Sequence, residues 1–296
     1  MRITRTHKKR AYSRIAGAKS QSAMEYLMTY GWAILIIAIV LGALFSLGVF
    51  SLSNLSPRAQ PGTCEVLRTS AVLSLAGQCN GLLPEYVGGF NGQSSYVLGP
   101  LPTNSLSVTL ASWFLEKANV GAVETLIGDQ NGYGVAAYGG CTAGTVDLVQ
   151  QAQFFLCPDY AITTNTWYSV VMTLQQPDSS HVVYQLYVNG VLEYTSPNEV
   201  LPNSPTAMLI GSGDAPSVQM FDGLISNVQV YNTTLSQAEI TALYDEGIGG
   251  APIDLNNLVG WWPLNGNAND YSGFSNNGNA VSVAYTNSWT SGYSAP

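Results

Sequence analysis

Side chains that could perform acid–base or nucleophilic catalysis are scarce in this chain. Its 296 residues include only two histidines, and one of them, His7, lies in a basic N-terminal segment. The other, His181, stands alone at the end of the turn-like stretch 177–181, where we expect a solvated side chain. Asp245 and Glu246 are adjacent, so on a helix they cannot flank one bond as an acid–base pair. The sequence therefore predicts a protein that is not an enzyme.

Four cysteines could instead form cross-links: Cys64, Cys79, Cys141 and Cys157. An even number of cysteines in an exported domain indicates disulfides. Metal ligation is disfavoured, because the chain has no C-x-x-C motif and few histidines. Of the three pairings, we expect Cys64–Cys79 and Cys141–Cys157, because each closes a short local loop. Each bond would contribute about 3 kcal/mol in the chain-entropy model.

One apolar stretch, residues 32–50, determines on which side of a membrane the cysteines and the rest of the C-terminal part would lie. It contains no charge and no proline, and about 20 residues at 1.5 Å per residue cross the hydrocarbon core of a bilayer. The first 20 residues hold seven of the ten Lys and Arg residues and no acid. The positive-inside rule therefore places this end in the cytoplasm and the C-terminal part outside. A secretory signal peptide is the alternative, but its apolar core is usually shorter and ends at a small-residue cleavage site.

The junction between the basic and apolar segments is informative. Lys19 and Ser20 precede the run Gln21 to Glu25, which reads QSAME. This pattern resembles the class III signal peptide of archaeal type IV pilins and related filament subunits. In that family a prepilin peptidase cuts before the hydrophobic helix, which the mature protein keeps. The resemblance implies cleavage between Ser20 and Gln21, although family leaders more often end in Gly or Ala.

Glu25 would then be the fifth mature residue, at the head of an apolar helix. A carboxylate there is costly to bury unless it is paired. Cleavage creates a new α-amine at Gln21, so in a filament core of packed helices Glu25 could pair with the amine of a neighbouring subunit. In a plain membrane anchor, Glu25 would instead lie near the headgroups and benefit from the positive end of the helix.

Removal of the leader would also change the charge of the protein. The formal charge is −8 for the whole chain, and residues 21–296 keep three basic and eighteen acidic residues, a formal charge of −15. A domain with so few cations is not expected to neutralise phosphates, so nucleic acid is excluded as a partner.

The chain after residue 62 is patterned for β-structure. Short runs rich in β-branched and aromatic residues recur between turn signals, as in a β-sandwich. Asn189-Gly190 predicts a type I′ hairpin. The one helical signal is 235–244, where Ser236 and Glu239 would form a capping box. We expect a leader over 1–20, a transmembrane or polymerisation helix over 21–55, a hinge over 56–62 and an all-β ectodomain over 63–296.

Six segments in order resemble the LamG-like, concanavalin A-like jelly roll and cover most of residues 86–246: 88–97, 107–117, 166–174, 184–194, 221–232 and 235–244. The segment 258–283 resembles the stretch that normally opens such a domain, yet here it follows the closing helix. We infer a circular permutation, in which 258–263 and 280–285 pair where N-terminal strands would lie. A truncated second repeat and a strand donated to the next subunit are the alternatives.

The resemblance also suggests a metal. Related domains often hold calcium through the Asp of this motif, here Asp270, in a loop that also contains Asn265 and Asn267. Calcium takes six to eight oxygen ligands, so Asp222 is a candidate second carboxylate. The alternative is a series of Asx-turns that order the loop without metal. No other cofactor is expected.

Two further features concern the outer surface. Trp261 and Trp262 face opposite sides of a strand, so we expect one in the core and the other exposed as rim packing or as a platform for glycans. Asn54 and Asn232 begin N-glycosylation sequons, and Pro57 makes the first a poorer acceptor.

We interpret the chain as a structural subunit of an archaeal type IV pilus-like filament with an adhesive, glycan-binding ectodomain. It would lie in the cell membrane as a precursor and in an extracellular filament when mature. Its partners would be copies of itself, the prepilin peptidase and assembly machinery, and surface glycans. The alternative is a membrane-anchored surface lectin that does not polymerise, and a glycosidase ranks third.

Overall fold

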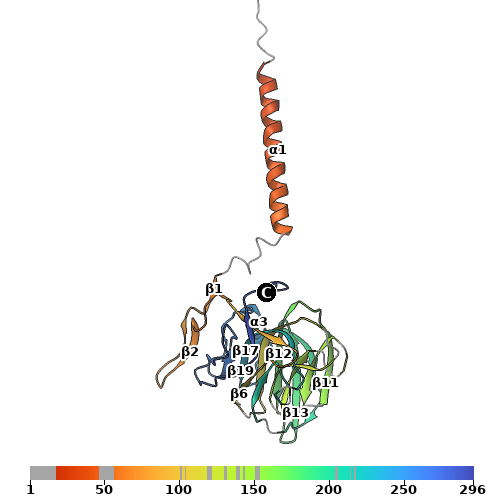
Figure 1. Ribbon diagram of the computed structural model, residues 1–296, viewed down its shortest axis with the longest axis vertical. Helices are drawn as coiled ribbons and strands as arrows, with labels where there is room; N and C mark the ends of the chain where they lie inside the picture. The colour runs from red at the N-terminus through yellow and green to blue at the C-terminus, as the bar shows by residue number, and fades with distance from the viewer. Residues whose placement is uncertain are drawn as a thin grey trace, which may run out of the picture. The chain divides into compact units, whose positions relative to one another are not determined.

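The computed structural model describes residues 18–46 and 57–296, apart from short gaps at 101, 104, 119–121, 130–131, 138–140, 143, 151–153, 204–205, 214 and 217. The chain divides into two compact units, residues 1–54 and residues 55–296. The first contains a single described helix and the second contains all of the described strands (Figure 1).

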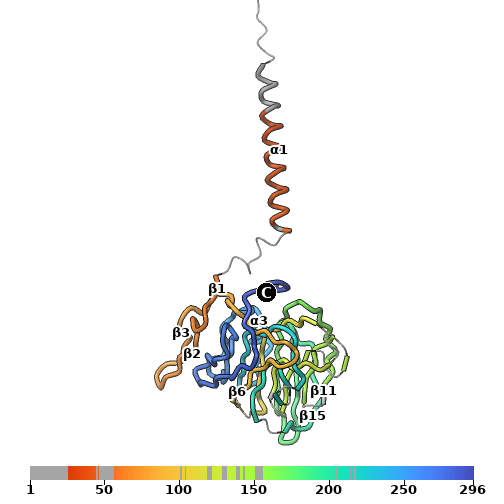
Figure 2. The backbone as a smooth tube through the Cα atoms, viewed as in Figure 1, coloured from red at the N-terminus to blue at the C-terminus, as the bar shows by residue number. Residues whose placement is uncertain are grey.

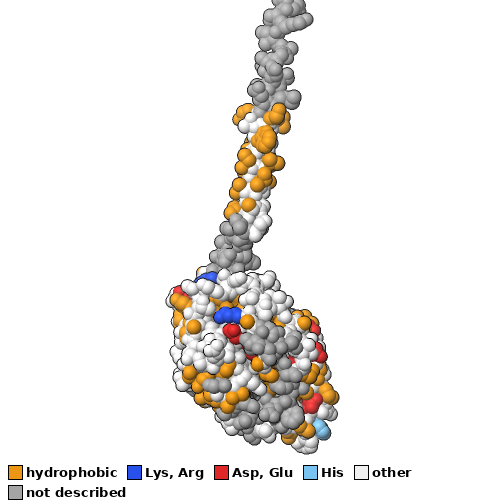
Figure 3. All heavy atoms as spheres, turned by 45° about the vertical axis from the view of Figure 1, so that its right-hand side comes forward, with side chains coloured by type: hydrophobic (Ala, Val, Ile, Leu, Met, Phe, Trp, Pro, Cys, Tyr) orange, Lys and Arg blue, Asp and Glu red, His pale blue; other side chains and the backbone are white. Residues whose placement is uncertain are grey.

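The helix α1 spans Ala18–Ser46. Its segment Tyr26–Leu44 has a mean hydropathy of 2.3, long and apolar enough to cross a membrane. Every side chain from residue 26 to residue 43 is exposed, and hydrophobic side chains line the face of the helix seen in Figure 3. The helix thus begins three residues before the expected start, and residues 47–56 of the expected helix and hinge lie outside the described residues.

The second unit is an antiparallel sandwich of two large sheets, which confirms the expected all-β fold. The nine-stranded sheet has the order β14-β13-β12-β7-β17-β5-β20, with β15 on β13 and β18 on β17. Its strands are β5 (Val87–Asn91), β7 (Val108–Glu116), β12 (Trp167–Gln175), β13 (His181–Val188), β14 (Val191–Thr195), β15 (Glu199–Val200), β17 (Asp222–Tyr231), β18 (Leu258–Trp262) and β20 (Ala284–Thr286).

The seven-stranded sheet has the order β11-β10-β9-β8-β16-β6-β19. Its strands are β6 (Tyr96–Gly99), β8 (Glu124–Asp129), β9 (Tyr133–Ala137), β10 (Thr145–Gln150), β11 (Phe154–Ala161), β16 (Met208–Ile210) and β19 (Asn279–Val281). Apolar side chains from the inner faces of both sheets fill the core, among them Phe90, Phe114, Tyr184, Phe221 and Trp262.

Two local predictions are confirmed. Asn189 and Gly190 both have positive φ, at 49° and 76°, as the turn between β13 and β14 requires. The helix α3 (Gln237–Asp245) begins with the expected capping box between Ser236 and Glu239. This helix covers the outer face of the nine-stranded sheet with Ile240 and other apolar residues.

The C-terminal segment supplies strands to both sheets. β18 pairs with β17 and β20 pairs with β5 in one sheet, while β19 pairs with β6 in the other. After β20, Trp289 is 1 % exposed and lies edge-on to Trp167. The segment 258–263 thus contains β18, and the segment 280–285 is divided between β19 and β20, which lie in different sheets. The circular permutation stays a prediction.

The segment that enters the domain is held tightly. β1 (Arg58–Ala59) pairs in parallel with β4 (Leu83–Pro84), so residues 58–59 of the expected hinge belong to the domain. β2 (Cys64–Arg68) and β3 (Leu73–Gly77) form a hairpin beside the C-terminal segment (Figure 2). Arg68 fastens this hairpin, because its guanidinium donates to the carbonyl oxygens of Ser272, Leu255 and Leu258 at 2.7 Å each.

Candidate functional site

His181 and the pair Asp245 and Glu246, which the sequence analysis considered for catalysis, lie on different elements. His181 pairs with Asp178 at 2.9 Å in an exposed turn before β13. Asp245 ends α3, and Glu246 is its C-cap. No group of three or more His, Cys, Asp or Glu side chains suited to a metal exists within the described part of the chain.

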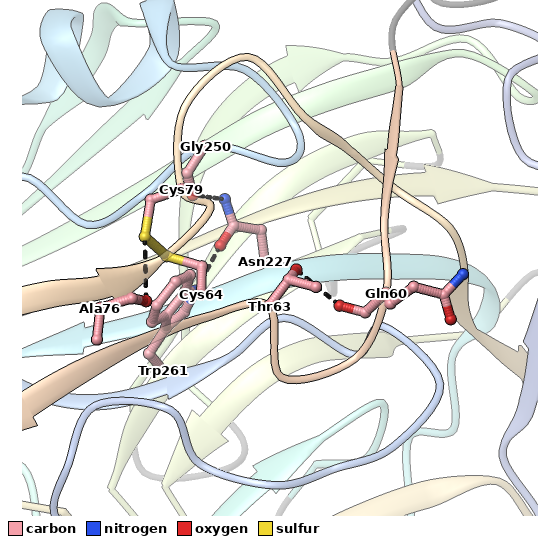
Figure 4. Close-up of a disulfide and its surroundings, with 8 residues drawn as sticks. All are labelled: Gln60, Thr63, Cys64, Ala76, Cys79, Asn227, Gly250 and Trp261. Atoms are coloured by element: carbon pink, nitrogen blue, oxygen red, sulfur yellow. Dashed lines mark hydrogen bonds between the residues drawn. A yellow bond between two sulfur atoms is a disulfide. The ribbon is translucent and has the colours of Figure 1, made fainter.

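The two expected disulfides, Cys64–Cys79 and Cys141–Cys157, are both present, with Cα–Cα distances of 5.0 and 5.7 Å. The first closes the β2–β3 hairpin (Figure 4). The second joins β11 to the loop before β10. Both pairings are local, as the spacing predicted.

A small cavity lies beside the first disulfide, and Figure 4 shows the residues around that bond. On one side, the indole Nε1 of Trp261 donates to Oδ1 of Asn227 at 2.8 Å, and Nδ2 of Asn227 donates to the carbonyl of Gly250 at 3.0 Å. The cavity volume is about 50 Å³. That is room for a water molecule or two, and it is too small for a sugar ring.

Neither tryptophan of β18 is a platform on the surface. Trp261 is 3 % exposed and Trp262 is 1 % exposed. Trp262 packs in the core between the sheets, while Trp261 is covered by α3 and by Val66 of the β2–β3 hairpin. The expectation of one exposed tryptophan is therefore wrong, because elements distant in sequence cover the outer face of this strand.

Both oxygens of the Asp270 carboxylate accept two hydrogen bonds from groups within the protein. Its Oδ1 accepts the backbone N–H of Trp261 and of Ser272, both at 2.9 Å. Its Oδ2 accepts the hydroxyl of Ser272 and the backbone N–H of Asn276, both at 2.8 Å. These four donors tie the loop to β18, which is the metal-free Asx arrangement.

The other residues of the expected calcium site do not complete it. Asn265 bridges two backbone groups, since its Oδ1 accepts the N–H of Tyr86 and its Nδ2 donates to Ala59 of β1. Asn267 accepts the N–H of Asn269. Asp222 begins β17, whereas β18 pairs with residues 228–231 of that strand, about 20 Å away at 3.3 Å per residue. This set of residues does not fit a calcium ion.

A larger hollow lies instead beside Asp222. It has a volume of about 540 Å³ and is open to solvent. Its wall is built by β5, β17 and β20 and by the chain directly after β7 and β20. The lining residues are Gly89, Phe90, Asn91, Ser95, Lys117, Asp222, Leu224, Ser282, Ala284, Thr286 and Ser288.

Two opposite charges stand on this wall. The backbone N–H of Lys117 donates to the carbonyl of Asp222 at 3.1 Å, so the two residues are neighbours across β7 and β17. Among the described residues the only ion pair within 4.0 Å is His181–Asp178. The Lys117 ammonium and the Asp222 carboxylate are therefore not joined to each other.

Two buried carboxyl groups, those of Glu116 and Glu124, lie behind the wall of this hollow. Glu116 is 1 % exposed, and burial, with a smaller effect from the charge of Asp222, raises its pKa to about 7. Glu124 is fully buried and accepts the backbone N–H of Asp222 through Oε2 at 2.7 Å. We did not predict this cluster. One signal was present in the sequence, because Glu116 is an acid at the end of the apolar run that forms β7.

The asparagines of the two sequons have different positions. Asn54 lies outside the described residues. Asn232 is exposed, and the hydroxyl of Thr234 in its sequon donates to the carbonyl of Leu174 at 2.9 Å. Ser20, Gln21 and Glu25 are described only as part of the backbone of α1.

A comparison of the sequence with protein families agrees with the observed β-sandwich fold. Residues 90–241 match the family model Laminin_G_3, described as the concanavalin A-like lectin/glucanases superfamily. The match spans just over half of the chain, so the chain belongs to this superfamily. No curated protein matches the chain.

One solved structure shows a similar fold at low identity, and a second match is weaker. A Bacteroides ovatus ATCC 8483 protein, provisionally assigned as carbohydrate-binding, is 19 % identical with a TM-score of 0.54, over 74 % of this chain and 65 % of that one. The chain therefore spans slightly less than two thirds of that protein. A heptameric SAP-like pentraxin from Limulus polyphemus is 17 % identical with a TM-score of 0.47, over 68 % of this chain and 95 % of the pentraxin.

Proposed function

We propose that the chain is a subunit of a pilus-like surface filament, made as a membrane precursor, which presents a glycan-binding domain outside the cell. The observation that carries the proposal is the uniform exposure of apolar side chains on α1 from residue 26 to 43, directly after the QSAME run.

A helix that is apolar on all sides needs apolar surroundings on all sides. A helix that packed on its own domain would need one apolar stripe and a polar opposite face. In α1, by contrast, Tyr26, Trp32 and Ile37 are each more than half exposed, and so are residues on the intervening turns. Lipid would cover this surface in the precursor, and the helices of neighbouring subunits would cover it in a filament.

The glycan-binding part of the proposal is supported by the fold. The superfamily contains lectins, and the Bacteroides ovatus protein has a carbohydrate-binding assignment. The domain also has an open, polar hollow of about 540 Å³, which is within the usual range for small-ligand sites.

N-terminal sequencing of the protein from its native membrane or filament tests the cleavage of the leader peptide. We expect Gln21 as the first residue, because the class III leader would be cut before the helix. A mature protein that still begins near Met1, or one that begins after residue 50, would overturn the filament proposal.

A substitution at Glu25 tests the assembly step. Glu25→Ala should reach the membrane normally yet polymerise poorly, since a neighbour's α-amine would lose its partner inside the filament, at a cost of several kcal/mol. Glu193→Ala, which removes an exposed acid from the domain, is the matched control. Normal filament yield from Glu25→Ala would favour the non-polymerising membrane lectin.

A further inference from the structure

We propose that the hollow beside Asp222 is the glycan site, and that it selects uncharged, hydroxyl-rich glycans over acidic ones. This inference rests on the glycan-binding function proposed above and adds its location and its chemistry. Much of the wall, residues 282–288, lies outside the segment 90–241 that matches the family model. The C-terminal segment therefore completes a site whose two charged residues, Lys117 and Asp222, lie within the matched segment.

The size of this hollow suits a small ligand, unlike that of the cavity beside the disulfide. Its volume of about 540 Å³ is within the range of roughly 300–1,000 Å³ that small-ligand sites occupy. The cavity beside the Cys64–Cys79 disulfide measures about 50 Å³. A third hollow, around Met28 and Trp32, is part of the exposed apolar surface of α1.

The wall presents groups that recognise hydroxyls. The Asp222 carboxylate accepts hydrogen bonds, and the Lys117 ammonium donates them. Of two adjacent sugar hydroxyls, one can donate to the Asp222 carboxylate and the other can accept from the Lys117 ammonium. Hydrogen bonds that involve a charged partner are stronger than those between neutral groups, so these two side chains would dominate the binding.

The surrounding charge disfavours acidic glycans. The charges of Lys117 and Asp222 nearly cancel, and residues 57–296 hold seventeen acidic residues. The chain from residue 57 onward has only three basic residues, and charged side chains are sparse on the face seen in Figure 3. A carboxylate on a sugar would therefore find one cation here and a negative background, whereas a neutral sugar would meet no repulsion.

Close packing and hydrogen bonds hold the wall together. At Gly89 of β5 a side chain is impossible, because a Cβ would lie 2.7 Å from the carbonyl oxygen of Ala284 in β20. The hydroxyl of Ser95 donates to the carbonyl of Ser282 at 2.8 Å. Oδ1 of Asn91 accepts three backbone N–H groups of the following turn. A preformed wall lowers the entropy cost of binding.

The test measures binding of the full chain in detergent to two sets of probes by titration calorimetry. The first set contains neutral gluco-, galacto- and manno-oligosaccharides, and the second contains their uronic-acid or sialylated counterparts. We expect binding of at least one neutral probe and weaker or absent binding of its acidic counterpart. Asp222→Ala should weaken the neutral interaction by about tenfold or more, and Lys117→Ala by a smaller factor.

Two controls make the outcomes distinct. Asp245→Ala removes an exposed acid on α3 and should leave binding unchanged, and circular dichroism melts should show that all three variants are folded. Unchanged affinity in folded Asp222→Ala, or tighter binding of acidic probes, would overturn this site and leave a lectin function elsewhere on the domain. Failure of the unsubstituted protein to bind any probe would overturn both this site and the proposed glycan-binding function.

Discussion

Large apolar side chains are placed in opposite ways in the two units of this protein. In α1, Tyr26 is 79 % exposed and Trp32 is 64 % exposed, whereas in the sandwich Trp113 and Trp262 are 4 % and 1 % exposed. The hydrophobic free energy per unit of area, about 25 cal/mol per Å², is the same for both. The sandwich therefore gains its stability from contacts within the chain, while under the proposed function the helix would be covered by lipid or by other helices.

Removal of the C-terminal segment should have the largest effect. A fragment of residues 57–257 lacks β18, β19 and β20 and the buried Trp262 and Trp289. Loss of one buried aromatic side chain costs about 3–5 kcal/mol, which is comparable to much of a domain's net stability. We expect this fragment to be unfolded or aggregated, and residues 57–296 to melt cooperatively. A cooperative melt of the short fragment near that of the long one would show that the tail is an appendage.

Loss of a disulfide should have the next largest effect. Replacement of Cys64 and Cys79 by serine opens a loop with a sequence separation of 15 residues, and should lower the free energy of unfolding by about 3 kcal/mol. Urea unfolding of the domain measures this change. Reducing agent should then destabilise the double variant only through Cys141–Cys157. An unchanged urea midpoint would mean that the hairpin contributes its stability through contacts such as those of Arg68.

Glu116 predicts a pH dependence of the domain. Its pKa is about 7 in the folded state against an ordinary value of 4.5, so the folded protein holds this proton more tightly than the unfolded chain. Stability should therefore fall as the pH rises from about 4.5 to about 7 and change little above that range. Glu116→Gln removes the penalty and should stabilise the domain by about 2 kcal/mol at pH 8, with little effect at pH 4.

Urea unfolding at the two pH values checks this prediction. Glu65→Gln, which changes an exposed glutamate, is the matched control and should have little effect at either pH. Equal effects of Glu116→Gln at pH 4 and pH 8 would show that its carboxyl group does not retain a proton in the folded domain.

Removal of the helix should have the smallest effect on the sandwich. The fragment 57–296 should melt within about 2 °C of the domain in the full chain, because the core is complete without α1. The helix, in contrast, should remain with detergent or lipid in every variant above. A large loss of domain stability in the fragment would contradict the division into an independent domain and a dependent helix.

Features that depend on neighbours in the sequence were predictable. Asn189-Gly190 specifies its turn through backbone conformation, and Ser236 and Glu239 cap α3 across three residues. The disulfides close loops of 15 and 16 residues, for which chain proximity favours the local partner. The apolar run of α1 likewise needs no tertiary information.

Predictions about the surroundings of single side chains depended on distant segments and were harder to make. Asp270 looked like a calcium ligand in a loop rich in oxygen, yet the backbone N–H groups of Trp261 and Asn276 use its carboxylate. Trp261 could not be recognised as buried, because Val66 and α3 cover it from far along the chain. A period of two in a strand shows which side chains share a face, and it does not show what covers that face.

The sequence by itself determined the apolar helix, the β-rich domain that follows it, and the local turns and cross-links, because short-range backbone preferences and hydrophobic patterning act between near neighbours. Only the tertiary structure decided that the C-terminal strands complete both sheets, and that β20 lies against β5 to form the wall of the hollow. It also placed Lys117 beside Asp222 with Glu116 and Glu124 behind them. Antiparallel pairing can join segments at any separation, so these neighbours depend on the packing of the whole domain.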